Sequence, residues 1–210
     1  MATTVAIFDV DGTLVRGGTE RRFFYYLVRQ KKLTPLRAVG FMMRLAAAPH
    51  GRFHDKNYLA GMRVEDLRQL SRRCFQEVIR YRLRSAGVAC VQGHQAEGHK
   101  IVLLTGSLDF VVLPLKEYLA ADWLIATEPA RQDGYFTGAI AGFHPRGENK
   151  RLLLEELARR QGFDLSGSFA YGDHEEDVPL LGCVGRPVAV NPTRTLQRVA
   201  QTRRWPIRYF

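Results

Sequence analysis

The sequence contains few cysteines and no long apolar run. Its three cysteines, Cys74, Cys90 and Cys183, are scattered along the chain and lack the spacing of a metal site. Such an odd and sparse count is typical of a reducing compartment. No apolar stretch is long enough to span a membrane, and the first residues lack the basic and apolar regions of a secretory signal peptide. These absences argue against a disulfide framework, and we expect the protein to be cytoplasmic.

Internal repeats and low-complexity tracts are also missing. With 25% charged and 46% hydrophobic residues over 210 positions, the composition is that of an ordinary globular protein. The length suits one substantial domain, or a core with a smaller insertion. The histidines give no metal signal, because His50 and His54 straddle a break at Pro49 and Gly51. We therefore expect no zinc site.

The net charge of +10 is concentrated in one part of the chain. Residues 16–85 hold 17 Lys and Arg against 5 Asp and Glu, whereas the remainder holds 14 against 16. This basic segment either attracts phosphorylated substrates or forms a solvated surface, and the sequence leaves both interpretations open. It lacks interleaved aromatic residues and a recognised nucleic-acid motif, so a nucleic-acid-binding module is a remote alternative and we expect no nucleic acid partner.

Short apolar segments alternate with helical patterns along most of the chain. This alternation predicts an α/β protein with a Rossmann-like, doubly wound parallel sheet. Asp133 and Gly134 are typical of a turn between two short antiparallel strands within 127–142. The expected strands are residues 5–9, 101–105, 123–126, 168–172 and 187–190, and the expected helices are 111–119, 150–161 and 193–202.

The stretch between the first two strands reads as helical throughout. Thr19 is a candidate helix cap, and residues 64–83 carry apolar side chains at three- and four-residue steps. So much helix exceeds a single crossover, which predicts a small helical cap at 17–85 inserted into a core of 1–16 and 86–210. Within it, residues 34–48 are apolar with arginines on one side. Such a helix is more often buried against its neighbours than placed on a membrane surface, and we favour burial.

The segments that follow the strands carry the chemistry. Asp9 and Asp11 follow the first strand, with Gly12 and Thr13 directly after them. Close carboxylates repel one another and must share a cation, a proton or a task. Because the carboxyl ends of parallel strands form the ligand edge of an open α/β sheet, we expect a site there.

Three further segments can converge at the same edge. They are Thr105-Gly106-Ser107 after the second strand, Lys150 at a helix start, and the acidic run Asp173 to Asp177. Acidic groups alone would repel a phosphate, so a hard cation must intervene, and Mg²⁺ prefers carboxylates together with phosphate oxygens. One aspartate can attack phosphorus while its neighbour supplies a proton, with Thr105 and Lys150 holding the phosphoryl oxygens.

These four ordered motifs resemble those of the haloacid dehalogenase superfamily of phosphatases. The helical insertion directly after the first motif resembles the C1-type cap of its subfamily IB, the phosphoserine-phosphatase-like branch. The likeness extends from Val5 to about Phe210. It implies that Asp9 is the nucleophile, that Asp11 is the general acid and base, and that Thr105, Gly106 and Lys150 bind phosphate. It also implies that Mg²⁺ is bound by Asp9, by Asp173 and by the backbone carbonyl of Asp11, with Asp177 in support.

Two departures from that pattern limit what it implies about the substrate. Gly18 stands where phosphoserine phosphatases carry an acidic residue that binds the substrate's amino group, and Glu20 comes two residues late. The resemblance therefore does not predict phosphoserine as the substrate. His174 and Glu176 replace the small residue and the asparagine usual in the fourth motif. We favour a solvent-facing His174 over one that contacts the substrate.

The resulting hypothesis is a Mg²⁺-dependent phosphatase of a small organic phosphomonoester, acting through an aspartyl-phosphate. Two alternatives share its motifs: a phosphatase of phospholipid head groups or lysophospholipids, and a phosphotransferase to an alcohol acceptor. We expect a small phosphorylated substrate as the partner; membrane-surface contact is the less favoured alternative.

Overall fold

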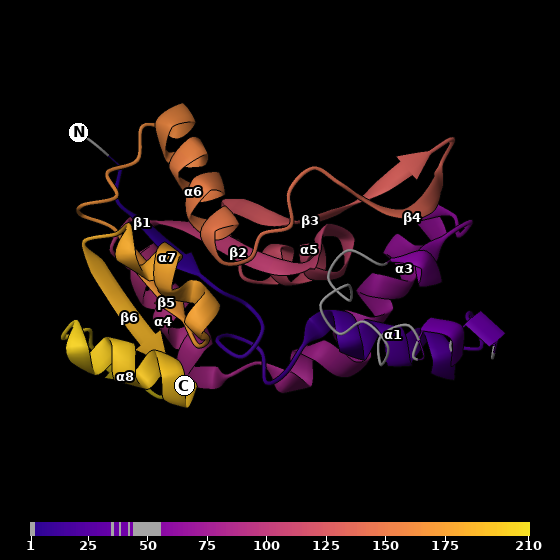
Figure 1. Ribbon diagram of the computed structural model, residues 1–210, viewed down its shortest axis with the longest axis horizontal. Coiled ribbons are helices and arrows are strands. Elements are labelled where there is room, and N and C mark those ends of the chain that lie inside the picture. Colours follow the sequence, from indigo (N-terminus) through magenta and orange to yellow (C-terminus); the bar gives the residue numbers. More distant parts are fainter. Residues whose placement is uncertain (1–2, 35, 38, 42, 44–55) are drawn as a thin grey trace.

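The protein is described by a computed structural model that places all residues except 1–2, 35, 38, 42 and 44–55 (Figure 1). Its centre is a seven-stranded sheet in the order β4-β3-β2-β1-β5-β6-β7. Every neighbouring pair is parallel except β3 and β4. The strands are β1 (Val5–Phe8), β2 (Lys100–Leu108), β3 (Trp123–Gln132), β4 (Tyr135–Ala141), β5 (Phe169–Gly172), β6 (Arg186–Val190) and β7 (Ile207–Arg208).

Helices cover both faces of this sheet, because alternate residues of the buried strands point to opposite sides. Val5 and Ile7 pack in one apolar cluster with residues of α6 (Glu148–Gln161), α7 (Val178–Gly182) and α8 (Arg194–Thr202). Ala6 and Phe8 pack in a second cluster with residues of α4 (Ser85–Ala96) and α5 (Asp109–Tyr118). The doubly wound sheet that the sequence predicts is confirmed.

The order of the strands fixes where a ligand can bind. From β1 the chain proceeds outward through β2 and β3 on one side, and β5 then pairs with the other side of β1. The direction of winding therefore reverses between β1 and β5, and such a switch point opens a crevice at the carboxyl ends of the strands. Asp9 follows β1 and Asp173 follows β5, so both lie at this crevice.

Between β1 and β2 the chain forms a helical insertion, whose described helices lie toward the end of the molecule away from α6 and α8 (Figure 1). Its described elements are α1 (Thr19–Arg29), η2 (Asn57–Leu59), α3 (Val64–Cys74), the π-helical η3 (Phe75–Ile79) and η4 (Arg80–Arg82). The insertion is tied to the β3–β4 hairpin, because Lys56 and Gly61 donate backbone hydrogen bonds to Gly138 and Phe136. In the described part of the chain, no helix is long and apolar enough to cross a membrane.

Two local expectations are wrong, and one strand differs in length. The N-cap of α1 is Gly18 rather than Thr19, because the Thr19 side chain bonds to Ser107 instead. The periodic run at 64–83 is not one α-helix but continues after Cys74 as a π-turn and a 3₁₀ turn. The strand expected at 123–126 is present but longer than expected, because it continues as β3 to Gln132 and forms one arm of the expected hairpin with β4.

Candidate active site

The crevice between β1 and β5 contains a cavity of about 260 Å³. Its lining comes from several elements that are far apart in the sequence. The residues expected from the sequence that line it are Asp9, Asp11, Thr105, Gly106, Lys150, Asp173 and Asp177. The structure therefore brings all seven of these residues together.

A buried ion triad occupies the floor of the site. Lys150 Nζ donates to Asp9 Oδ1 and to Asp177 Oδ1, both at 2.6 Å, and all three side chains are at least nine-tenths buried. Burial alone would lower the pKa of Lys150, but the charges of Asp177 and Asp9 outweigh it and raise the pKa above its usual value. The ammonium group is therefore a fixed positive charge beside Asp9.

Burial raises the pKa of the carboxyl groups of the site, whereas it lowers that of the lysine. It raises the pKa of Asp9 well above its usual range, although Lys150 opposes this shift. Burial, followed by the charge of Asp177, raises the pKa of Asp173 to about 6. Crowded carboxylates in a poorly solvated crevice favour a cation among them, because each one destabilises the others' charge.

Three observations test whether a divalent cation fits these residues. Asp9 Oδ2 is buried and has no hydrogen-bond partner among the described residues. One carboxylate oxygen from each of Asp9, Asp173 and Asp177 lies within 4.8 Å of the others. The donors are all oxygen atoms, which Mg²⁺ prefers. The set fits a hard divalent cation.

Gly12 makes this close approach of the carboxylates possible. Its φ of +100° lies in a region that L side chains rarely adopt, and a Cβ atom there would stand 2.1 Å from Asp173 Oδ2. The turn after β1 therefore admits the Asp173 carboxylate only because position 12 has no side chain. Thr13 donates its hydroxyl to Asp173 Oδ1 at 3.3 Å and helps to orient it.

Asp11 has a different set of partners from Asp9. Its Oδ1 accepts the backbone N–H of Thr19 at 2.7 Å, and its Oδ2 accepts the hydroxyl of Ser107. The Thr19 hydroxyl in turn donates to Ser107 Oγ at 2.9 Å. One carboxylate is thus bound to the fixed lysine, whereas the other is oriented by the first turn of α1 and by β2.

Thr105 and Gly106 belong to the polar end of β2. Thr105 is fully buried, and its Oγ1 accepts the backbone N–H of Ser107 at 3.1 Å. A Cβ atom at position 106 would come within 3.2 Å of the His144 ring, so glycine lets this ring pack on the strand. Thr127 holds the ring through a contact of 2.6 Å between its Oγ1 and His144 Nδ1.

Sequence reasoning missed His144 and the pairing of Glu20 with Lys56 and Tyr58. His144 comes from the loop between β4 and α6, and no pattern in that loop marks it. Glu20 lines the cavity from α1, and its carboxylate accepts Lys56 Nζ at 2.7 and 2.9 Å and the Tyr58 hydroxyl at 3.1 Å. Glu20 stands out in the sequence only because it lies near the position at which phosphoserine phosphatases carry an acidic residue. The sequence does not show that Lys56 is buried and paired with it.

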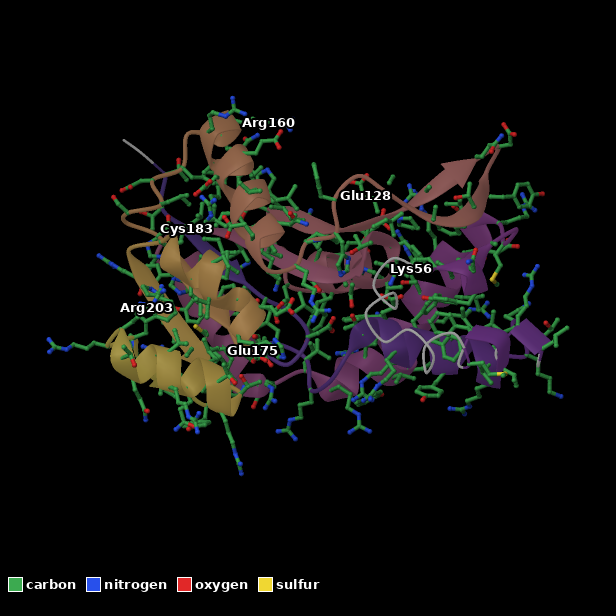
Figure 2. The ribbon with its side chains drawn as sticks, viewed as in Figure 1. Lys56, Glu128, Arg160, Glu175, Cys183 and Arg203 are labelled. Carbon is green, nitrogen blue, oxygen red and sulfur yellow. The ribbon has the colours of Figure 1, made fainter. Side chains whose placement is uncertain are left out.

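The two departures in the fourth motif have separate structural roles. His174 is about half exposed at its side chain and accepts the backbone N–H of Glu176, which caps the short η5 turn (Glu175–Asp177). Glu176 forms an ion pair with Arg146 across the cavity wall. Figure 2 shows Glu175 of the same turn below α7. The negative charge of Glu176 is therefore compensated by the protein itself.

Comparisons with known proteins agree with this geometry. A family model described as haloacid dehalogenase-like hydrolase matches residues 6–182. The "Inhibition of morphological differentiation protein" of Streptomyces azureus is 32% identical, with 99% of this chain and 78% of that protein covered. Phosphoserine phosphatase SerB1 of Mycobacterium tuberculosis is 29% identical, with 99% and 71% covered. A solved structure from Bordetella pertussis Tohama I, of unknown function, is 29% identical with a TM-score of 0.86, and 99% and 98% of the chains are covered.

Proposed function

The chain belongs to the family of haloacid dehalogenase-like hydrolases and is a phosphoric monoester hydrolase, and from this premise we propose that it hydrolyses a small organic phosphomonoester with the aid of Mg²⁺. The observation that carries the proposal is the separate partner sets of two neighbouring carboxylates. Asp9 is bound to Lys150, and Asp11 is bound to Thr19 and Ser107. This separation suits a nucleophile and a proton donor.

In the first step, an Asp9 carboxylate oxygen attacks phosphorus and forms an acyl phosphate. The bond between phosphorus and the leaving oxygen breaks, and Asp11 gives this oxygen a proton. In the second step, Asp11 takes a proton from water, and the hydroxide oxygen attacks phosphorus. The P–O bond to Asp9 then breaks, inorganic phosphate leaves, and both carboxyl groups return to their starting state.

Other residues bind the phosphoryl group and the cation. The Lys150 ammonium and the Thr105 hydroxyl lie at the edge of the cavity beside Asp9 and bind phosphoryl oxygens, with the Gly106 backbone alongside. Asp9, the Asp11 carbonyl and Asp173 would hold Mg²⁺, and Asp177 would support them. When bound, the cation neutralises negative charge on the phosphoryl group as the nucleophile approaches.

We also propose that the helical insertion acts as a cap over the site. In the first turn of α1, Thr19 donates a hydrogen bond to Asp11, and Glu20 lines the cavity. The leaving group therefore lies against the insertion, whereas the phosphoryl group lies against the sheet. A cap of this kind excludes bulk water and selects the leaving group.

The test is an Asp9→Asn variant assayed on p-nitrophenyl phosphate with Mg²⁺ and, separately, with excess chelator. We expect turnover at the background rate for the variant and for the chelated wild type. Asp133→Asn is a matched control, because Asp133 lies in the β3–β4 turn outside the cavity and asparagine tolerates its positive φ. Retained activity in Asp9→Asn would contradict the proposal. An added alcohol acceptor that captures the phosphoryl group would indicate a phosphotransferase instead.

A further inference from the structure

The helical insertion carries several large apolar side chains on its outside. Tyr25 and Val28 are one turn apart on α1, with exposed fractions of 54% and 39%. Leu36, Val39 and Met43 follow at helical spacing in the next segment, with exposed fractions of 84%, 55% and 68%. We call these five residues the apolar face of the insertion. Single exposed apolar residues are ordinary, but exposed apolar residues that recur at helical spacing on successive segments indicate an interaction surface.

The core of the insertion is formed by other side chains of the same segments. On α1, Phe23 and Leu27 are fully buried. In the next segment, Phe41 turns inward, with its ring 5.0 Å from that of Phe24 and 4.8 Å from that of Tyr58. The sequence favours burial of the whole helix at 34–48; of its described residues, Phe41 follows that expectation, whereas Leu36, Val39 and Met43 do not. Met42 lies outside the described residues.

Several exposed cations lie on the same segments of the chain as the apolar face. The exposed cations on α1 and just beyond it are Arg21, Arg29, Lys31, Lys32 and Arg37. Lys32 also borders a hollow of about 450 Å³ whose other charged residues are Arg63, Arg73 and Asp66. Within the described part of the chain, neither Lys32 nor either of these two arginines forms a salt bridge. The described part of the insertion therefore carries exposed cations outside salt bridges together with exposed aliphatic and aromatic groups.

We propose that this face binds the surface of a bilayer that contains anionic phospholipids. The apolar side chains enter the region between head groups and acyl chains, while the lysines and arginines pair with lipid phosphates. A second copy of the chain fits less well, because it would bring two sets of cations together. A nucleic acid would use the cations but gains nothing from Leu36, Val39 and Met43.

The apolar face and the cavity share helix α1, so a membrane bound at this face would lie near the cavity. Glu20 lines the cavity, and Val28 belongs to the same helix eight residues later, about 12 Å along its axis. A bilayer bound at Val28 would therefore lie roughly one lipid head group from the cavity. The binding itself does not depend on the proposed roles of Asp9 and Asp11, so it can be tested separately from turnover.

The experiment is co-sedimentation of the purified protein with vesicles of phosphatidylcholine alone or with about a third of phosphatidylglycerol. We expect binding only to the anionic vesicles, and we expect it to weaken as salt rises. Leu36→Glu with Val39→Glu should reduce the partition coefficient at least about tenfold. The matched control is Leu152→Glu with Tyr209→Glu, which places the same charge on exposed apolar residues of α6 and the C-terminal segment.

A second pair of variants separates charge from apolar contact. Lys31→Glu with Lys32→Glu should also lose binding, whereas Arg159→Glu with Arg160→Glu should retain it, because Arg160 lies at the outer end of α6, away from α1 (Figure 2). All variants should hydrolyse p-nitrophenyl phosphate at the wild-type rate, which shows that they fold. No binding of the wild type to anionic vesicles at low salt would overturn the proposal, and so would equal losses in the control variants. Salt-resistant dimers abolished by Leu36→Glu with Val39→Glu would overturn it in favour of self-association.

Discussion

Replacing Lys150 with methionine tests the buried ion triad directly. The substitution keeps much of the side-chain volume but removes the charge that lies 2.6 Å from both Asp9 and Asp177. Two buried carboxyl groups are then left without a counter-charge, in a crevice that also contains Asp173. We expect the folded protein without metal to be strongly destabilised, because each carboxyl must either remain charged without compensation or take up a proton.

The magnitude follows from the burial of the three side chains. Removing one partner of a buried ion pair costs about 3–5 kcal/mol. For a chain of this length each kcal/mol shifts the melting temperature by about 2–4 °C, so we expect a decrease of about 6–20 °C. The control is Arg151→Met at the next position of α6, where the side chain is one-third exposed and pairs with Glu148 and Glu155. Exposed pairs contribute at most about 1 kcal/mol each, and that variant should melt near the wild type.

The assay is thermal and urea unfolding with chelator present, at pH 8 and pH 5. The defect should shrink at pH 5, because the uncompensated carboxyl groups of the variant take up protons more readily when folded than when unfolded. Adding Asp177→Asn should restore at least about 1 kcal/mol, since it removes one of the two opposed charges. A melting temperature within 3 °C of the wild type would refute this reasoning. Strict additivity of the two substitutions would refute it as well.

Two further predictions concern proton transfer and pH. Asp11→Asn should slow the first step, release of the leaving alcohol in a single turnover, by about 10²–10⁴ for an alkyl phosphate but much less for p-nitrophenyl phosphate, because that leaving group needs no proton; equal losses in this single-turnover rate would contradict the role of Asp11 as proton donor. The pKa of His94 lies below its usual 6.5 because of burial and the nearby His99, so an unfolded chain binds a proton there that the folded chain does not. Stability should therefore fall as pH drops below about 6.5, and more steeply in the wild type than in His94→Gln; parallel curves of melting temperature against pH would contradict this.

The parallel sheet could be predicted because its strands are short apolar segments that recur between helical patterns. Its last strand, β7, could not, since Ile207 and Arg208 give no periodicity. The break after Cys74 was also hidden, because the apolar residues on both sides of it recur at three- and four-residue steps. Local propensity favoured Thr19 as a cap, but its hydroxyl instead donates to Ser107 across the site.

The candidate site could be predicted in part for a similar physical reason. Asp9, Thr105 and Asp173 lie in or directly after parallel strands, so topology alone brings them to one edge. His144 and the Glu20–Lys56 pair depend on how a loop and the insertion pack over that edge. That packing is set by many contacts between distant residues, which a single sequence does not encode in any local pattern. Their roles, like those of the motif residues, stay predictions until variants are assayed.

Because Asp11 accepts a hydrogen bond from the Thr19 amide, the orientation of its carboxylate depends on the position of helix α1. Thr19 begins α1, and Asp11 accepts from it and from Ser107 on β2. If α1 tilts away from the sheet, Asp11 loses one of its two donors and is free to rotate. In the proposed mechanism, Asp11 would then be correctly oriented for proton transfer only while α1 packs against the sheet. This dependence would protect the proposed acyl phosphate on Asp9, because water that entered an open site would meet no correctly oriented base.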